Sequence, residues 1–141
     1  LVLGFNAFAR GATRMAVTKR PMARDVAEAY CAPYDSWSNR IATLRFVEDI
    51  PLGPEHPSYQ VVTDTAERLA LFGETPALIC WGREDFVFDD AFLEDWRRRW
   101  PHAEVHVHEG CGHYVLEDAT EDVIGEIQSF LDRHPLGGAQ A

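Results

Sequence analysis

The spacing of apolar residues changes about halfway along the chain. In the first half they recur at helical intervals, as Ile41 and Leu44 illustrate, and this spacing predicts helices. The expected helices cover residues 6–17, 22–34, 36–50 and 58–72. Asp35 and Ser36 are the expected N-caps of the third helix. The Pro-rich stretch "PLGPEHPSY" separates the third helix from the fourth.

The second half predicts strands alternating with helices. The apolar run "PALICWG" at 76–82 predicts a parallel strand that is buried on both faces. A helix is expected at 90–100, a second strand, "AEVHVHE", at 103–109, and a last helix at 120–134. Strand, helix, strand and helix with short loops indicate a parallel α/β layer. Two strands make a small sheet, so further strands are expected outside this sequence.

Composition and charge limit the classes of function. The chain has 141 residues, enough for about one domain, and a formal net charge of −10. This charge argues against nucleic acid, because phosphate binding needs a basic face. The opening "LVLGFNAFAR" lacks an initial Met and is too soon interrupted by polar residues for a signal peptide or a membrane span. We therefore expect a fragment of a longer protein.

Cysteine and histidine usage raises the question of a metal. Three cysteines without CxxC spacing argue against a disulfide framework or a structural zinc site, and fit a reducing cytoplasm. His106, His108 and His113 could supply three nitrogens to a metal. Strand alternation explains the first two equally well, as exposed residues opposite buried Val105 and Val107. The favoured interpretation has no metal.

The strongest candidates for chemistry are Asp85 and His113. Asp85 lies in "GREDFVFDD", directly after the first predicted strand, and His113 lies in "GCGHYVLED", directly after the second. Because the carboxyl ends of parallel strands meet at one edge of a sheet, the two side chains are expected close together. A carboxylate there can fix the imidazole tautomer and stabilise the imidazolium. Gly110 and Gly112 would let the backbone turn sharply.

Other roles remain open for these residues and their neighbours. Asp85 could cap the following helix, and His113 could be a polar residue in a turn. Glu84, Asp89 and Asp90 compete with Asp85 for the role of the acid, although Asp89 is better placed as an N-cap.

The two loops carry a resemblance to a known superfamily. "PALICWGREDFVF" followed by "GCGHYVLED" resembles the C-terminal half of an α/β-hydrolase, and the Trp-Gly-x-x-Asp pattern with the Gly-His loop is similar to the haloalkane-dehalogenase branch. Three earlier stretches, "GFNAFARGATRMAV", "CAPYDSWSNRIATLRFVEDIPL" and "HPSY", resemble the cap of the β-lactone decarboxylases of long-chain olefin biosynthesis. The resemblance covers roughly residues 1 to 134.

This resemblance implies an organisation of the chain. Residues 1–55 would form a helical cap, or lid, and residues 56–134 would form the C-terminal part of the α/β-hydrolase core, with the last two parallel strands and their helices. Residues 135–141 are expected to form a flexible tail. The nucleophile, an Asp, and the residues that bind the oxyanion or halide would lie outside this chain, which has no GxSxG or GxDxG motif.

The resemblance also implies an enzyme activity. The expected reaction converts cis-2,3-dialkyl β-lactones to cis-alkenes and carbon dioxide, with an Asp nucleophile outside this chain acting with His113 and Asp85. One alternative is a haloalkane dehalogenase, or another hydrolase of this fold, working through an alkyl-enzyme ester. Another is a non-catalytic remnant or an interaction module. Neither reaction requires a metal or an organic cofactor, and the fragment alone is expected to be inactive.

The cap offers apolar side chains to a hydrophobic small-molecule substrate. Phe5, Phe8 and Trp37 are the expected substrate-binding residues, although plain helix packing explains each of them too. The expected partners are this substrate, the missing N-terminal half of the fold and other enzymes of the olefin pathway, with no nucleic acid and no membrane span. The expected location is the cytoplasm.

Overall fold

The structure is a computed structural model, and it describes residues 5–135. The described chain forms two compact units. The first comprises residues 5–15 and 21–73, and the second comprises residues 16–20 and 74–135. The predicted boundary between cap and core at residue 55 stays a prediction, and the compact units divide the chain later, after Gly73. Residues 136–141 of the predicted tail lie outside the described residues.

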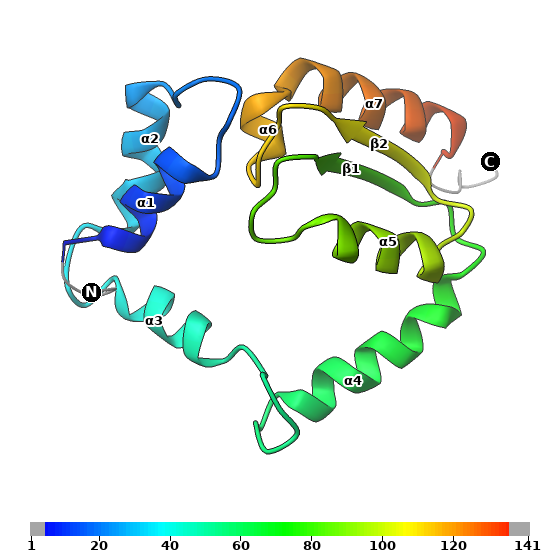
Figure 1. Cartoon of the computed structure of the whole chain (residues 1–141), viewed down its shortest axis with the longest axis horizontal. Coiled ribbons are helices and arrows are strands. Elements are labelled where there is room, and N and C mark those ends of the chain that lie inside the picture. The colour runs from blue at the N-terminus through cyan, green and yellow to red at the C-terminus, as the bar shows by residue number, and fades with distance from the viewer. Residues whose placement is uncertain (1–4, 136–141) are drawn as a thin grey trace, which may run out of the picture. The chain divides into compact units, whose positions relative to one another are not determined.

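The first unit is helical, as its apolar spacing predicted (Figure 1). Asn6, next to α1, donates a hydrogen bond from Nδ2 to the carbonyl oxygen of Cys31 in α2, at 3.5 Å. The helices of this unit are α1 (Ala7–Met15), α2 (Arg24–Cys31), the 3-10 helix η1 (Ala32–Tyr34), α3 (Ile41–Glu48), α4 (Tyr59–Arg68) and the 3-10 helix η2 (Leu69–Phe72).

Helix α3 begins later than predicted, so the expected caps are wrong. Asp35 and Ser36 precede a run of turns, and the helix starts only at Ile41, with no side-chain cap. Both side chains instead bind Asn39: Ser36 Oγ accepts from its backbone N–H at 3.2 Å, and Asp35 Oδ1 accepts from its Nδ2 at 2.8 Å. Short polar side chains that bind nearby backbone groups stabilise such turns in place of a helix.

The second unit has the predicted order of strand, helix, strand and helix. Strand β1 (Leu78–Gly82) pairs in parallel with β2 (Glu104–His108), from Leu78 opposite Glu104 to Gly82 opposite His108. Helices α5 (Asp90–Arg99) and α7 (Thr120–Arg133) lie on opposite sides of the two strands, and the short α6 (Val115–Asp118) precedes α7 (Figure 1). Helix α5 connects the two strands. Parallel strands need a long connection of this kind, usually a helix, because the chain must return to the start of the next strand.

Burial in the second unit is concentrated where the helices meet the strands. Leu93 of α5 and Val123 of α7 are almost fully buried, as is Cys111 in the loop after β2. Strand β1 was predicted to be buried on both faces, but its residues Leu78 to Trp81 are only partly buried. Within the described chain its one partner is β2, so its other edge has no strand beside it.

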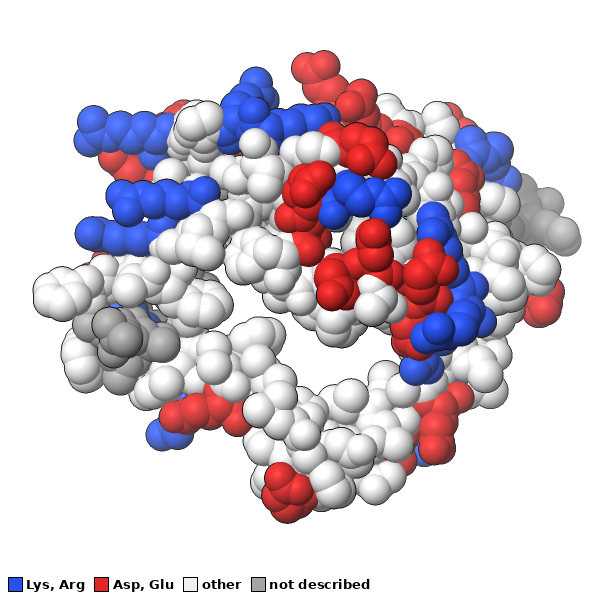
Figure 2. Space-filling model, in the orientation of Figure 1, with Lys and Arg blue, Asp and Glu red and all other residues white. Residues whose placement is uncertain are grey.

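Helix α5 begins as predicted and carries mixed charge on its surface. Asp89 Oδ1 accepts a hydrogen bond from the backbone N–H of Ala91 at 3.0 Å, which confirms Asp89 as the N-cap. Acidic and basic side chains lie next to one another over this helix (Figure 2). They form exposed ion pairs, such as that between Asp95 and Arg99, which contribute little to stability because water screens them. No described helix is long and apolar enough to cross a bilayer.

Candidate active site

Asp85 and His113 are in contact, as their positions after consecutive strands predicted. Asp85 follows β1 and His113 follows β2, so both lie at the carboxyl edge of the two-stranded sheet. His113 Nδ1 is 2.9 Å from Asp85 Oδ2, which is a hydrogen-bonding distance. The Asp85 side chain is 10% exposed and that of His113 is 29% exposed, so the acid is shielded while the imidazole reaches solvent. The predicted contact is confirmed, and the catalytic roles of the two residues stay a prediction.

The Asp85 carboxylate is held in place by its own loop. Its Oδ1 accepts hydrogen bonds from the backbone N–H groups of Val87 and Phe88, at 2.8 and 2.9 Å. This arrangement, in which an Asp side chain binds the backbone two and three residues later, stabilises a turn. One carboxylate oxygen therefore fixes the loop, and the other is directed at His113. Asp85 does not cap α5, because Asp89 does.

The neighbouring acids do not take the place of Asp85 beside His113. Asp89 caps α5, and Asp90 Oδ1 accepts from Arg83 at 2.8 Å. Glu84 donates its backbone N–H to the carbonyl oxygen of Cys111, at 2.8 Å, and so joins the two loops through the main chain. Of the four acids that the sequence left open, Asp85 is the one whose carboxylate is hydrogen-bonded to His113, and its role as the acid stays a prediction.

Both glycines of the His113 loop are required, for different reasons. Gly110 has a φ of +73°, a left-handed conformation that residues with a Cβ rarely adopt, as the predicted sharp turn requires. Gly112 has no such conformation. A Cβ at Gly112 would lie only 2.6 Å from the carbonyl oxygen of Ala16, so this glycine permits a close approach of two backbones.

The Asp118 side chain holds the same loop in place through hydrogen bonds. The sequence alone did not predict this role. The Asp118 carboxylate, in a residue only 8% exposed, accepts from the backbone N–H groups of Gly112 at 2.8 Å, Thr18 at 2.9 Å and Lys19 at 3.1 Å. Burial alone would raise the pKa of Asp118, but these hydrogen bonds outweigh it and hold the pKa below its usual 3.8. Spacing along the chain gave no signal for this role, because Thr18 lies 100 residues away.

Two aromatic rings lie beside the imidazole. The Phe88 ring centroid lies 5.4 Å from that of His113, and Tyr114 lies at 5.8 Å. Phe88 also packs edge-on against Phe92 of α5, at 5.1 Å. An apolar wall beside the histidine suits a hydrophobic substrate.

The predicted substrate-binding residues belong to the first unit. Phe5, Phe8 and Trp37 are 86%, 52% and 65% exposed, so none of them is buried by other residues of the described chain. Their contact with substrate stays a prediction.

The three histidines that could have supplied a metal site do not come together. His113 binds Asp85, whereas His106 and His108 both face Glu126 of α7, at 3.1 and 3.0 Å. The expectation that strand alternation exposes these two side chains is wrong for His108, which is 9% exposed. The reason is that α7 covers this face of the strands and presents a carboxylate to it.

The cysteines are free thiols. Cys31, Cys80 and Cys111 make no disulfide. Cys80 of β1 donates from Sγ to Glu126 Oε2 at 3.4 Å. Its burial and the neighbouring Glu126 raise the pKa of Cys80 from 9.0 to about 11, so the thiol keeps its proton at neutral pH.

A parallel α/β layer with a His–Asp pair at the carboxyl edge of its strands is the arrangement found in hydrolase-type α/β enzymes. The family model described as "alpha/beta hydrolase fold" matches residues 6–120. The chain belongs to the α/β-hydrolase fold family, and it corresponds to the C-terminal portion of that fold.

The relatives carry the names of two activities. The chain is 53% identical over 131 residues to "Cis-3-alkyl-4-alkyloxetan-2-one decarboxylase" of Shewanella oneidensis, and 46% identical over 132 residues to the protein of the same name from Xanthomonas campestris pv. campestris. These matches cover 93% and 94% of this chain. Among solved structures, it resembles haloalkane dehalogenase DbeA from Bradyrhizobium elkani USDA94, with a TM-score of 0.77, 25% identity and 94% of this chain covered.

The chain spans less than half the length of these proteins. It covers 41% and 44% of the two decarboxylases and 46% of the dehalogenase. The family assignment therefore rests on nearly the whole of this chain but on only part of each relative.

Proposed function

We propose that the protein containing this chain decarboxylates cis-2,3-dialkyl β-lactones to cis-alkenes, within long-chain olefin biosynthesis. The observation that carries the proposal is the 53% identity over 131 residues to a protein named as a cis-3-alkyl-4-alkyloxetan-2-one decarboxylase. An oxetan-2-one is a β-lactone, and the two alkyl groups of that name are the two arms of the future alkene.

The reaction balances without an oxidant or a reductant. The ring opens at the bond between the ring oxygen and C4 and at the bond between the carbonyl carbon and C3. The ring oxygen, the carbonyl carbon and the carbonyl oxygen leave as carbon dioxide, and C3 and C4 become joined by the double bond of the alkene. Strain in the four-membered ring favours this outcome.

His113 would take up a proton at Nε2 and return it within one turnover, because the overall reaction neither consumes nor releases a proton. With Nδ1–H donated to Asp85, the neutral imidazole presents Nε2 as its basic nitrogen, and the Asp85 carboxylate stabilises the charge when Nε2 takes a proton. The nucleophile in this proposal is an aspartate in a part of the protein outside this chain. It would bond to C4 and displace the ring oxygen as a carboxylate, and it would leave C4 again when the bond between that carboxyl carbon and C3 breaks to release carbon dioxide and the alkene. The length of the relatives, more than twice that of the matched region, is compatible with that placement.

Apolar side chains would receive the alkyl arms. Phe88 lies beside the His113 ring, and Phe5, Phe8 and Trp37 offer exposed aromatic surface in the helical unit. Apolar walls with a few polar groups at the reacting centre are the usual composition of a pocket for a hydrophobic ligand.

Haloalkane dehalogenation is the second candidate, favoured by the likeness to the Bradyrhizobium elkani dehalogenase. There the nucleophile would displace a halide, and His113 would activate the water that hydrolyses the alkyl-enzyme ester. Both reactions use the same His–Asp pair, so the pair does not separate them. The decarboxylase is preferred because the chain is 53% identical to the Shewanella oneidensis decarboxylase and only 25% identical to the dehalogenase.

The two candidates are separated by their products. The complete protein that contains this chain is offered a cis-dialkyl β-lactone and, separately, medium-chain bromoalkanes. The proposal predicts alkene and carbon dioxide from the lactone, measured by gas chromatography, with little bromide from the bromoalkanes. Rapid bromide release with the lactone unchanged would establish the dehalogenase instead.

A further inference from the structure

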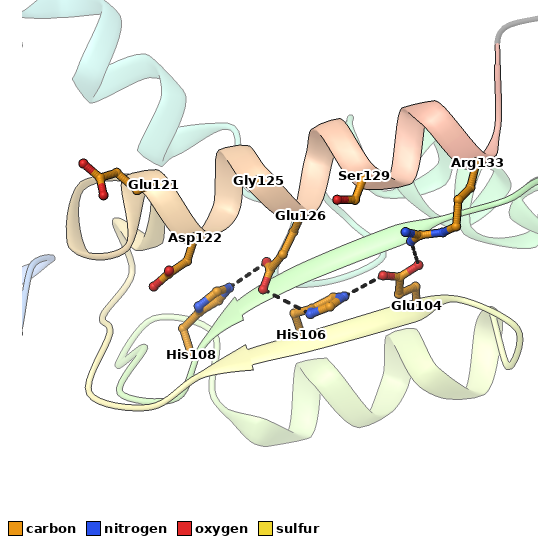
Figure 3. Close-up of a pocket in the computed structure, with 9 residues that line it drawn as sticks. All are labelled: Glu104, His106, His108, Glu121, Asp122, Gly125, Glu126, Ser129 and Arg133. Atoms are coloured by element: carbon orange, nitrogen blue, oxygen red, sulfur yellow. Dashed lines mark hydrogen bonds and ion pairs between the residues drawn. The ribbon is translucent and has the colours of Figure 1, made fainter.

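A second polar site lies between β2 and α7, away from Asp85 and His113. The strand and the helix border an open groove of about 720 Å³ (Figure 3). Titratable side chains of both elements point into it, among them Glu104, His106 and His108 of β2 and Glu126 of α7. The proposed decarboxylation uses none of these residues.

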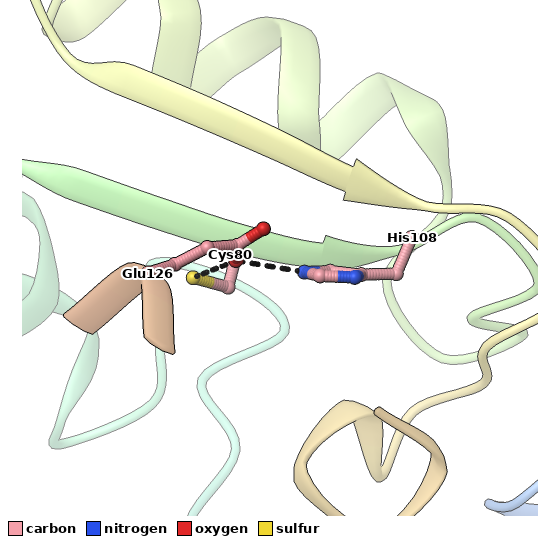
Figure 4. Close-up of side chains that lie close together, drawn as sticks. All are labelled: Cys80, His108 and Glu126. Carbon is pink, nitrogen blue, oxygen red and sulfur yellow. Dashed lines mark hydrogen bonds and ion pairs between the residues drawn. The ribbon is translucent and has the colours of Figure 1, made fainter. Parts of the chain in front are cut away.

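Two residues that line this groove, His108 and Glu126, meet a third group of different chemistry, the thiol of Cys80. Cys80 comes from β1, His108 from β2 and Glu126 from α7, and their Sγ, ring nitrogen and carboxylate oxygen all lie within 4.8 Å of one another (Figure 4). Because three separate elements supply them, the cluster depends on the packing of α7 against both strands. Thiolate, imidazole and carboxylate are together the ligands that zinc takes in proteins.

The spacing of these atoms is close to that of a zinc site. Glu126 Oε2 lies 3.4 Å from Cys80 Sγ and 3.0 Å from His108 Nε2. Zinc bonds of roughly 2.0–2.3 Å at tetrahedral angles place the oxygen, nitrogen and sulfur ligand atoms about 3.3–3.6 Å apart. The third pair, Cys80 Sγ and the His108 ring nitrogen, lies within 4.8 Å, so side-chain shifts of about 1 Å would bring the three atoms to the spacing of a zinc site.

A chain of outer partners holds the carboxylate. The other oxygen of Glu126 lies 3.1 Å from His106 Nδ1, and His106 Nε2 lies 2.7 Å from Glu104 Oε1. Glu104 in turn forms an ion pair with Arg133 of α7. Outer hydrogen-bond partners of this kind orient the ligands in metal sites and tune their basicity.

We propose that Cys80, His108 and Glu126 bind a zinc ion. Zinc would replace the thiol proton of Cys80, and His108 would carry its remaining proton on Nδ1 so that Nε2 can bind the metal. One thiolate and one carboxylate balance the two positive charges. Three protein ligands leave the fourth position to water from the groove, as in sites that keep an open coordination position. This proposal does not depend on the proposed decarboxylase activity.

The purified chain, freed of metal by a chelator and then dialysed, provides the test. Cobalt(II) is added first, since it takes the same geometry and absorbs light. The proposal predicts one equivalent bound per chain, with a near-ultraviolet thiolate-to-cobalt charge-transfer band that zinc abolishes. In the same chain, zinc should protect Cys80 from alkylation, measured by mass spectrometry, while leaving the alkylation of Cys31 unchanged.

Matched variants locate the site. Cys80→Ser should abolish the charge-transfer band, and His106→Phe, which removes only the hydrogen bonds of an outer partner, should weaken zinc binding by about 10–100-fold. Cys31→Ser in the helical unit should leave both unchanged. Circular dichroism checks that each variant is folded. If the unaltered chain binds no stoichiometric metal, or if Cys80 remains open to alkylation in saturating zinc, the cluster is only a hydrogen-bonded link between the strands and α7.

Discussion

At the scale of single residues, the tautomer of His113 depends on the identity of residue 85. In Asp85→Asn the amide oxygen can still accept from the backbone of Val87 and Phe88, which directs the amide NH₂ at His113 Nδ1. The imidazole then carries its proton on Nε2, where the reaction needs a base. We expect turnover of the lactone by the complete protein to fall by about 10²–10⁴-fold, with little loss of stability.

A neighbouring aspartate provides the control for this substitution. Asp89→Asn keeps a good N-cap for α5, and its turnover should match that of the unaltered protein. Nitrogen-15 NMR of the imidazole reports the tautomer directly. Unchanged turnover in Asp85→Asn would show that Asp85 is not the acid of the site.

The Asp118 side chain is predicted to stabilise the folded chain in a pH-dependent way. Its pKa is lowered in the folded chain, so its stabilising contribution is present above about pH 4 and is lost as the pH falls through the lower folded-state pKa. Asp118→Asn should cost about 1–3 kcal/mol at pH 7, because the amide replaces a charged acceptor of several N–H groups. The difference from the unaltered chain should shrink at acid pH. Urea unfolding at several pH values measures both effects, and a difference that does not vary with pH would contradict this account.

At the scale of elements, two glycines of the second unit should respond oppositely to alanine. Gly110→Ala forces a left-handed conformation on a residue with a Cβ, and we expect a loss of about 1–2 kcal/mol in the free energy of unfolding. Gly125 lies in α7, where a Cβ would meet nothing within 4 Å. Gly125→Ala should therefore stabilise the chain by about 0.5–1 kcal/mol. Thermal unfolding compares the two, and equal effects would contradict the assigned backbone roles.

The elements themselves could be predicted from the sequence where the period of apolar residues was clear. The two strands and the helices between and after them were found, and so was the Asp89 cap, because local side-chain chemistry determines them. The caps at Asp35 and Ser36 were placed wrongly, since the same side chains stabilise a turn equally well.

Contacts between distant segments could not be predicted in this way. Asp85 and His113 are an exception, because parallel strands bring consecutive carboxyl ends to one edge. The meeting of Cys80, His108 and Glu126 depends on the register of β1 with β2 and on the rotation of α7. To predict the contact of Asp118 with Thr18, one must know where the segment around Thr18 runs in space, and that segment has no strand or helix pattern in its sequence.

At the scale of the whole molecule, the 141-residue chain is expected to show no turnover of β-lactones or bromoalkanes. Covalent catalysis needs the nucleophile, which we place outside this chain. The assay uses the purified chain beside the complete protein, with alkene and bromide as the products measured. Turnover by the chain that disappears in His113→Ala would mean that a residue within it acts as the nucleophile.

The central claim is that His113, held by Asp85, acts in the reaction of the complete protein. The most direct measurement is the rate of alkene release from a cis-dialkyl β-lactone by the unaltered protein and by His113→Ala, with His102→Ala, at an exposed histidine, as the control. We predict that His113→Ala lowers the rate by about 10²–10⁴-fold, the usual contribution of proton transfer by a positioned side chain, while His102→Ala leaves it unchanged. An unchanged rate in a folded His113→Ala protein would contradict the claim and leave His113 as a residue of a turn.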